Sequence, residues 1–99
     1  PRLLGMYVRD EAVLPMAAMI HRMTQRAAEL FGLRGRGVIR PGAYADLTLF
    51  DPATVRDCAT WRQGYAPPVG VEHVFVNGGH TVVNGALVGP GCGRPLPRC

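Results

Sequence analysis

The sequence of 99 residues contains no lysine, so its positive charge rests on arginine alone. The eleven arginines are spread from Arg2 to Arg98 and give a formal net charge of +4. Proteins that bind nucleic acids concentrate their cations on one face or one helix, where they displace counterions. The only short group here is Arg34, Arg36 and Arg40, which lie among glycines. We therefore expect no nucleic-acid partner.

The sequence also lacks a long apolar run. None approaches the roughly 18 residues that a membrane-spanning helix needs, and the first residues lack the charged, apolar and small-residue zones of a signal peptide. We therefore expect no membrane association. The chain starts at Pro1, without an initiator methionine and inside an apolar segment. We expect a truncated chain, from which any upstream signal would be missing.

The sequence has no paired cysteine motif, and this excludes two classes of small protein. Cys58, Cys92 and Cys99 are odd in number and far apart, with no CxxC pair and no histidine at the spacing of a zinc finger. Neither a disulfide framework nor a metal finger is expected. The pattern is typical of a reducing compartment, so we predict a cytoplasmic protein.

An amphipathic helix is the clearest element that the sequence does contain. Residues 15–31 place apolar side chains at helical spacing, Pro15 suits the first helical position, and Gly32 suits the turn after the last one. We expect the apolar face to pack into a core; its members are Met16, Ile20, Met23, Ala27 and Leu30. Residues 2–8 resemble the tail of a preceding helix.

From Gly35 onwards, glycines separate short runs of valine, leucine and aromatic residues, which is typical of a β-sheet. We predict tight turns at Asn77-Gly78-Gly79 and Asn84-Gly85, and a long loop over residues 52–70. The expected strands are 38–39, 47–50, 71–77, 80–84 and 86–88. A helix followed by short antiparallel strands predicts an α+β fold. So few strands leave open edges, so we expect further strands from elsewhere to complete the sheet.

The acidic residues of the β region form no catalytic motif. Asp46 follows a glycine turn, where its carboxylate can accept backbone N–H groups and fix that turn, and Asp51 precedes Pro52 in a strand-ending turn. We assign both a structural role. Asp57 and Glu72 belong to no motif either. The glycine-rich run 89–93 precedes no helix that would bind an anion, and neither GxSxG nor a Cys/His nucleophile arrangement is present.

His73 and His80 flank the first hairpin turn and can face each other across it. A metal site there would need a third ligand, and Glu72 points to the opposite face of its strand from His73. His21 stands alone on the helix, without the HExxH spacing of a zinc site. We therefore predict no catalytic, cofactor-binding or metal-binding residue in this chain.

Two spaced motifs carry a resemblance to a known family. Gly37-x-Ile39-x-x-Gly42-x-x-Ala45-Asp46-Leu47 is followed by Val74-x-Val76-Asn77-Gly78 and a closing strand with Gly85. These residues resemble the C-terminal end of amidohydrolase-superfamily enzymes, including hydantoinases, dihydroorotases and deacetylases. Residues 4–10, 23–24, 50–57 and 59–60 and the glycine-rich tail are similar, more narrowly, to the N-acyl-D-amino-acid deacylase (D-aminoacylase) group. Residues 25–28 and 61–65 depart from that group.

The resemblance implies a metal-dependent (β/α)₈ barrel flanked by a small β-sandwich built from both ends of the chain. Residues 1–34 would then be a terminal helical segment of the barrel side, 35–90 the C-terminal part of the sandwich, and 91–99 an extended tail. In such enzymes a zinc-bound water attacks the amide carbon of the substrate while an aspartate handles the proton.

The metal-binding histidines and that aspartate would lie at the ends of barrel strands, upstream of Pro1. The resemblance thus implies that the parent enzyme, not this chain, holds zinc and hydrolyses small N-acyl-D-amino acids. The chain would be inactive and would pack against the N-terminal part of its own polypeptide. Two alternatives stay open: an amidohydrolase of the hydantoinase or dihydroorotase type, and a non-catalytic β-module that binds a protein partner through its helix and sheet edges.

Overall fold

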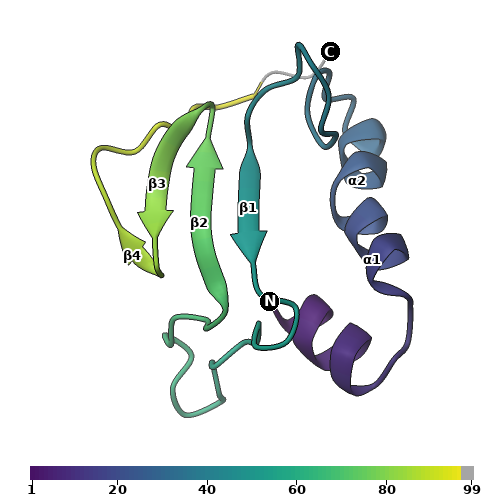
Figure 1. The fold of residues 1–99 in the computed structure, drawn as a ribbon, viewed down its shortest axis with the longest axis vertical. Helices are drawn as coiled ribbons and strands as arrows, with labels where there is room; N and C mark the ends of the chain where they lie inside the picture. Colours follow the sequence, from purple (N-terminus) through teal and green to yellow (C-terminus); the bar gives the residue numbers. More distant parts are fainter. Residues whose placement is uncertain (97–99) are drawn as a thin grey trace.

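The computed structural model describes residues 1–96 and has helices followed by a four-stranded sheet (Figure 1). The helices are η1 (Leu3–Asp10, a π-helix), α1 (Met16–Met23) and α2 (Gln25–Leu30). The strands are β1 (Leu47–Phe50), β2 (Val71–Val76), β3 (Gly79–Val83) and β4 (Ala86–Leu87). This confirms the predicted α+β order. Within residues 1–96, no helix is long and apolar enough to cross a bilayer.

The sheet is antiparallel, and its strands are neighbours in chain order, β1-β2-β3-β4. Two tight turns produce this order. Asn77 and Gly78 have φ values of 50° and 80°, and Asn84 and Gly85 have 49° and 80°. Left-handed backbone at both central residues is the geometry of a two-residue hairpin turn that matches the twist of the flanking strands. The two predicted hairpin turns are thus confirmed.

The predicted strand at residues 38–39 is wrong. Gly37 has a φ of 81°, and it packs so closely on the helices that a Cβ there would lie 2.8 Å from the carbonyl oxygen of Thr24. The backbone therefore turns toward the helices instead of extending beside β1. Ile39 remains 90% exposed. A strand needs a hydrogen-bonded neighbour, and no described strand pairs with this segment.

The predicted helix over residues 15–31 is divided in two. Thr24 has φ −117° and ψ −88°, and its hydroxyl donates a hydrogen bond to the carbonyl oxygen of Ile20 at 2.7 Å. Threonine hydroxyls compete for backbone acceptors and disturb helices in this way. The break shifts the buried face from the expected stripe, because Met19 and Ala28 are buried whereas Leu30 is 72% exposed. The predicted end near Phe31 is confirmed, and Gly32 has a φ of 68°.

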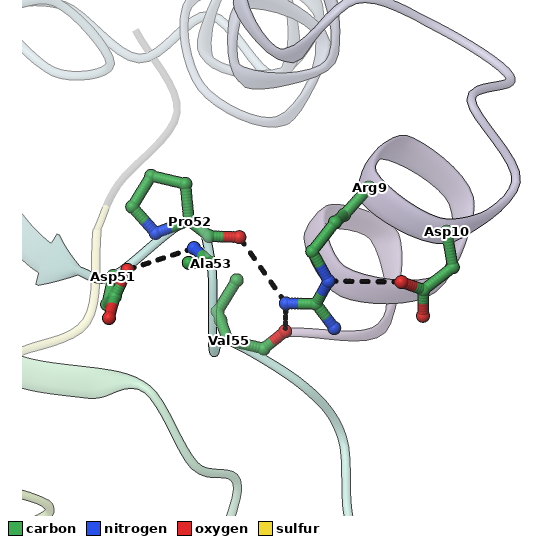
Figure 2. Close-up of polar contacts among 6 residues, drawn as sticks. All are labelled: Arg9, Asp10, Asp51, Pro52, Ala53 and Val55. Atoms are coloured by element: carbon green, nitrogen blue, oxygen red, sulfur yellow. Dashed lines mark hydrogen bonds and ion pairs between the residues drawn. The ribbon is translucent and has the colours of Figure 1, made fainter.

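The hydrophobic core lies where the first two helices meet the turn after β1. Leu4, Met19 and Val55 form its centre, and Val55 is only 1% exposed. Figure 2 shows how the guanidinium of Arg9 joins η1 to this turn: its Nη1 donates to the carbonyl oxygens of Val55 at 2.7 Å and Pro52 at 3.3 Å. One arginine thus satisfies two carbonyl groups beside the core.

The loop over residues 52–70 is present as predicted, with one isolated β-bridge between Arg56 and Val69. Trp61 and Tyr65 are fully exposed at its tip. The tail predicted over residues 91–99 has no regular structure up to Leu96, and residues 97–99 lie outside the described part of the chain. Val88 donates its N–H to the carbonyl oxygen of Thr81 at 2.9 Å, so the tail leaves the sheet beside β3.

Two glycines with similar positive φ values allow a matched test of the core. Gly70 and Gly42 have φ values of 83° and 87°, but a Cβ at Gly70 would overlap the backbone of Val55, whereas one at Gly42 would meet nothing within 4 Å. Backbone strain alone should cost Gly42→Ala about 1 kcal/mol in the free energy of unfolding. Gly70→Ala should cost about 3 kcal/mol or more, because the core must also shift. Urea titration of both variants measures the difference; equal losses would contradict this account.

Candidate functional site

A groove of about 850 Å³ lies between the helices and the sheet. Its walls come from η1, α1, the segment that follows α2, and β1. Most of the lining is apolar and includes Leu4, Ile20, Met23, Val38, Ile39, Leu47 and Phe50. Several of these side chains are exposed: Met23 by 39%, Leu47 by 38% and Ile39 by 90%. The groove is therefore an apolar surface that the described residues leave uncovered.

Two side chains in the groove lining carry groups that can bind a metal: His21 on α1 and Asp46 just before β1. They do not form a metal centre. Within residues 1–96, no group of three or more histidine, cysteine or acidic residues is placed to hold a metal ion. A catalytic zinc site in proteins normally takes three protein ligands and keeps one position for water or substrate. The residues described here do not fit such a site.

A polar cluster that joins distant segments centres on Arg36. Its Nη1 donates to the carboxylate of Asp46, its Nη2 donates to Oδ1 of Asn77 at 2.8 Å, and its guanidinium stacks 4.0 Å from the centre of the Tyr44 ring. The Arg36 side chain is only 10% exposed. Charge-assisted hydrogen bonds and stacking both favour arginine over lysine at such a position. This role was not predicted from the sequence, in which Arg36 was only one member of a short group of arginines.

Asp46 fixes a turn, but not the glycine turn that precedes it. Its Oδ1 accepts the backbone N–H of Asn77 at 2.9 Å, which lies in the hairpin turn between β2 and β3. The Asn77 side chain in turn donates to the carbonyl oxygen of Cys92 at 2.8 Å. The hydrogen bond from Asn77 is the main cause that lowers the pKa of Asp46, and Arg36 lowers it further, while partial burial acts in the opposite direction.

The other two aspartates of the β region hold turns. Asp51 accepts the N–H of Ala53 at 2.9 Å, as Figure 2 shows, so its predicted role in a strand-ending turn is confirmed. Asp57 accepts the N–H of Ala59 at 3.0 Å, which is the main cause that lowers its pKa, and it pairs with Arg2 at 2.6 Å. Both carboxylates therefore serve the loop after β1. Glu72 is exposed on β2.

The histidines differ in their surroundings. Nδ1 of His73 lies 3.0 Å from Nε2 of His80, so the predicted meeting across the hairpin is confirmed. His21 is exposed on α1. Cys58 and Cys92 are free thiols, and Cys99 lies outside the described residues. Asn77 was foreseen as a turn residue, but its link to Asp46 over 31 residues has no signal in local sequence pattern.

Known proteins are similar in sequence to most of this chain. The model of the family described as "Amidohydrolase family" matches residues 3–87. The chain is 42% identical over 98 residues to the D-aminoacylase of Alcaligenes xylosoxydans xylosoxydans, and 46% identical over 77 residues to an N-acyl-D-glutamate deacylase from the same organism. These alignments cover 99% and 78% of the chain but 20% and 16% of the relatives. A dihydroorotase of Lactobacillus acidophilus is 29% identical over 85 residues.

Solved structures show the same likeness. A D-aminoacylase variant in complex with copper chloride superimposes with a TM-score of 0.94 at 42% identity, over 99% of this chain and 21% of that one. An N-acyl-D-glutamate deacylase from Bordetella bronchiseptica, complexed with zinc and a phosphonate inhibitor, gives a TM-score of 0.80 at 38% identity, over 86% of this chain and 20% of that one. The chain therefore spans about a fifth of the length of these relatives.

The lowered pKa of Asp46 predicts a pH dependence of stability. A pKa below the ordinary value of 3.8 means that the folded state favours the carboxylate, so this stabilisation is complete above that value and is lost as the pH falls through the folded pKa. Asp46→Asn should lower the free energy of unfolding by about 1–2 kcal/mol at pH 7, and by less below pH 3.8. Urea titrations of both proteins between neutral and acidic pH measure this difference.

Asp10→Asn is the matched control for this experiment. Asp10 pairs with Arg9 at 3.0 Å, but its side chain is 60% exposed. Exposed pairs contribute at most about 1 kcal/mol. A stability loss from Asp46→Asn that does not diminish in acid, or that Asp10→Asn matches at neutral pH, would argue against the proposed role of Asp46.

Proposed function

The chain belongs to the amidohydrolase family, whose model matches residues 3–87, and on this basis we propose that it is the C-terminal part of a metal-dependent enzyme that hydrolyses the amide bond of N-acyl-D-amino acids. The observation that carries the proposal is the 42% identity to D-aminoacylase over 98 residues, with a TM-score of 0.94 to a solved D-aminoacylase. The likeness extends over both the helices and the sheet.

The names of the relatives support the substrate class. D-aminoacylase, N-acyl-D-glutamate deacylase and N-acyl-D-aspartate deacylase are 42%, 46% and 45% identical to the chain. Their names share an acylated D-amino acid and differ in its side chain. We therefore propose an N-acyl-D-amino acid as substrate and assign no particular side chain. We also propose a cytoplasmic enzyme, on the basis of the cysteine pattern.

The chain itself serves this enzyme as a scaffold. Relatives solved with zinc or copper establish metal binding for those proteins, whereas the described residues here form no cluster of three or more metal ligands. We propose that zinc and the proton-transferring aspartate belong to a (β/α)₈ barrel outside this chain. Residues 1–34 would adjoin that barrel, 35–90 would form part of a composite β-sandwich, and 91–99 would be its tail.

The apolar groove supports a partner within the same polypeptide. The groove joins Ile20, Leu47 and Ile39 in one apolar surface, and removing such a surface from water is favourable. The outer edge of β1 borders it and pairs with no described strand. Because relatives are about five times as long as the aligned chain, we propose that their N-terminal counterpart covers this groove and edge.

Two alternatives remain to be tested against this proposal. The dihydroorotase of Lactobacillus acidophilus aligns over 83% of the chain, though at 29% identity, which supports a cyclic amide as the alternative substrate. The uncovered groove would equally suit a separate protein partner of a non-catalytic β-module. Under the first alternative the enzyme acts on a different substrate, whereas under the second the protein has no enzymatic activity.

Activity assays distinguish these proposals. The full-length protein should release the free amino acid from N-acetyl-D-amino acids, should leave the L-enantiomers and dihydroorotate nearly unchanged, and should lose activity on chelation and regain it with zinc, since bound metal lowers the pKa of its water. Residues 1–99 alone should show no turnover. Hydrolysis of dihydroorotate instead would support the first alternative, and turnover by residues 1–99 alone would overturn the scaffold role.

A matched pair of substitutions tests the covered groove. Ile39 and Leu87 are 90% and 87% exposed in this chain, but only Ile39 lines the groove. If the N-terminal counterpart covers the groove, Ile39→Asp buries a charge in the full-length protein and should cost about 2 kcal/mol or more, while Leu87→Asp should cost less than about 0.5 kcal/mol. Thermal and urea unfolding of the full-length variants measure both. Equal effects would mean that the groove remains open.

A further inference from the structure

We propose that His73 and His80 form a two-imidazole site for a divalent transition-metal cation, with Cu(II) as the preferred ion. The site lies on the hairpin of β2 and β3 and is independent of the amidohydrolase activity proposed above. The observation that carries it is the separation of 3.0 Å between Nδ1 of His73 and Nε2 of His80. Neutral imidazole nitrogen is the commonest protein ligand for such cations.

The strand register brings the two rings together. His80 lies opposite Phe75, and His73 is two residues from Phe75 on the same strand, so both histidines project from one face of the hairpin. They are diagonal neighbours, which long or aromatic side chains can bridge. The register shifts between Val74 and Phe75, and the β-bulge there leaves Thr81 as the extra residue of β3. The pairing of β2 with β3 therefore brings the two rings together.

The separation of the two nitrogens suits a shared metal ion. Metal–imidazole bonds are about 2.0–2.1 Å long, so two ligands in neighbouring positions of a tetragonal ion have nitrogens about 2.9 Å apart, against about 3.4 Å in a tetrahedron. The observed 3.0 Å is close to the tetragonal value. Tetragonal coordination is typical of Cu(II) and Ni(II), and Cu(II) binds nitrogen ligands most tightly among first-row divalent ions.

Contacts with neighbouring rings also restrict the two histidines before any ion binds. The His80 ring stacks on Phe75 with centroids 4.4 Å apart and 11° between the planes, and the His73 ring lies 5.1 Å from the His80 ring. Restricting the motion of a ligand side chain reduces the entropy lost on binding. When Cu(II) binds, the ring that donates the hydrogen bond would carry its proton on its other nitrogen, so both imidazoles stay neutral, and water would fill the remaining positions of the ion. Since protons compete for the same nitrogens, affinity should fall in acid.

The test is a titration of the full-length protein with CuCl₂, followed by calorimetry and by electron paramagnetic resonance. His73→Ala and His80→Ala remove one ligand each, and His21→Ala, which removes the third histidine of residues 1–99 at a position outside the hairpin, is the control. The unaltered protein and the His21→Ala variant should bind one copper ion per chain more than either of the other variants. The spectrum lost on substitution should show nitrogen coupling from two imidazoles.

Several outcomes would overturn the proposal. Equal copper stoichiometry in the unaltered protein and in both hairpin variants would show that the site does not exist. An equal loss of bound copper in the His21→Ala variant would show the same. Circular dichroism checks that each variant folds; if one does not, the other variant and the coupling pattern of the unaltered protein still decide. The readout is copper binding, so the absence of copper binding would not contradict the proposed hydrolase activity. Likewise, the absence of hydrolase activity would not contradict this site.

Discussion

The arrangement of the sheet depends on the hydrogen bonds that the Asp46 carboxylate accepts. This carboxylate receives the guanidinium of Arg36 from the segment after the helices and the backbone N–H of Asn77 from the β2–β3 turn. Asn77 then holds the tail through the carbonyl oxygen of Cys92. Removing one partner of such a network leaves the others unsatisfied, so the network acts as a unit. The network thereby joins Arg36 to the turn at Asn77, which is 41 residues later in the sequence, and then to the tail at Cys92.

The opposite end of the molecule is held by a different kind of force. There, burial of Leu4, Met19 and Val55 joins η1 and α1 to the turn after β1, and Arg9 satisfies the carbonyl oxygens of Val55 and Pro52. The apolar groove lies between these two fixed ends. Helices and sheet are therefore held apart at a defined spacing, with an uncovered apolar surface between them, which is the shape expected of a scaffold that another part of a protein completes.

Local patterns predicted the elements of this fold well, because their causes are local. Asn77-Gly78 and Asn84-Gly85 favour their turns through their own backbone conformation, and Asp51 holds a turn only two residues away. The strand expected at 38–39 failed because pairing depends on a distant neighbour, and the break at Thr24 arose from a single side-chain hydrogen bond. The contacts of Arg36 with Asp46 and Asn77 were not predicted for the same reason as the failure at 38–39. Contacts between distant segments leave no periodic signal in the sequence.

The hairpin turn at Asn77 also connects the Asp46 network with the proposed copper site. His73 and His80 lie on the two strands that this turn joins, and the turn itself is held by Asp46. A cation shared by the two imidazoles would restrain the strands, while Asp46 restrains the turn between them. Contributions of groups that act on one element are generally not additive. Copper bound at the hairpin would therefore reduce the stability lost when the Asp46 carboxylate is removed, because the same turn would already be restrained by its strands.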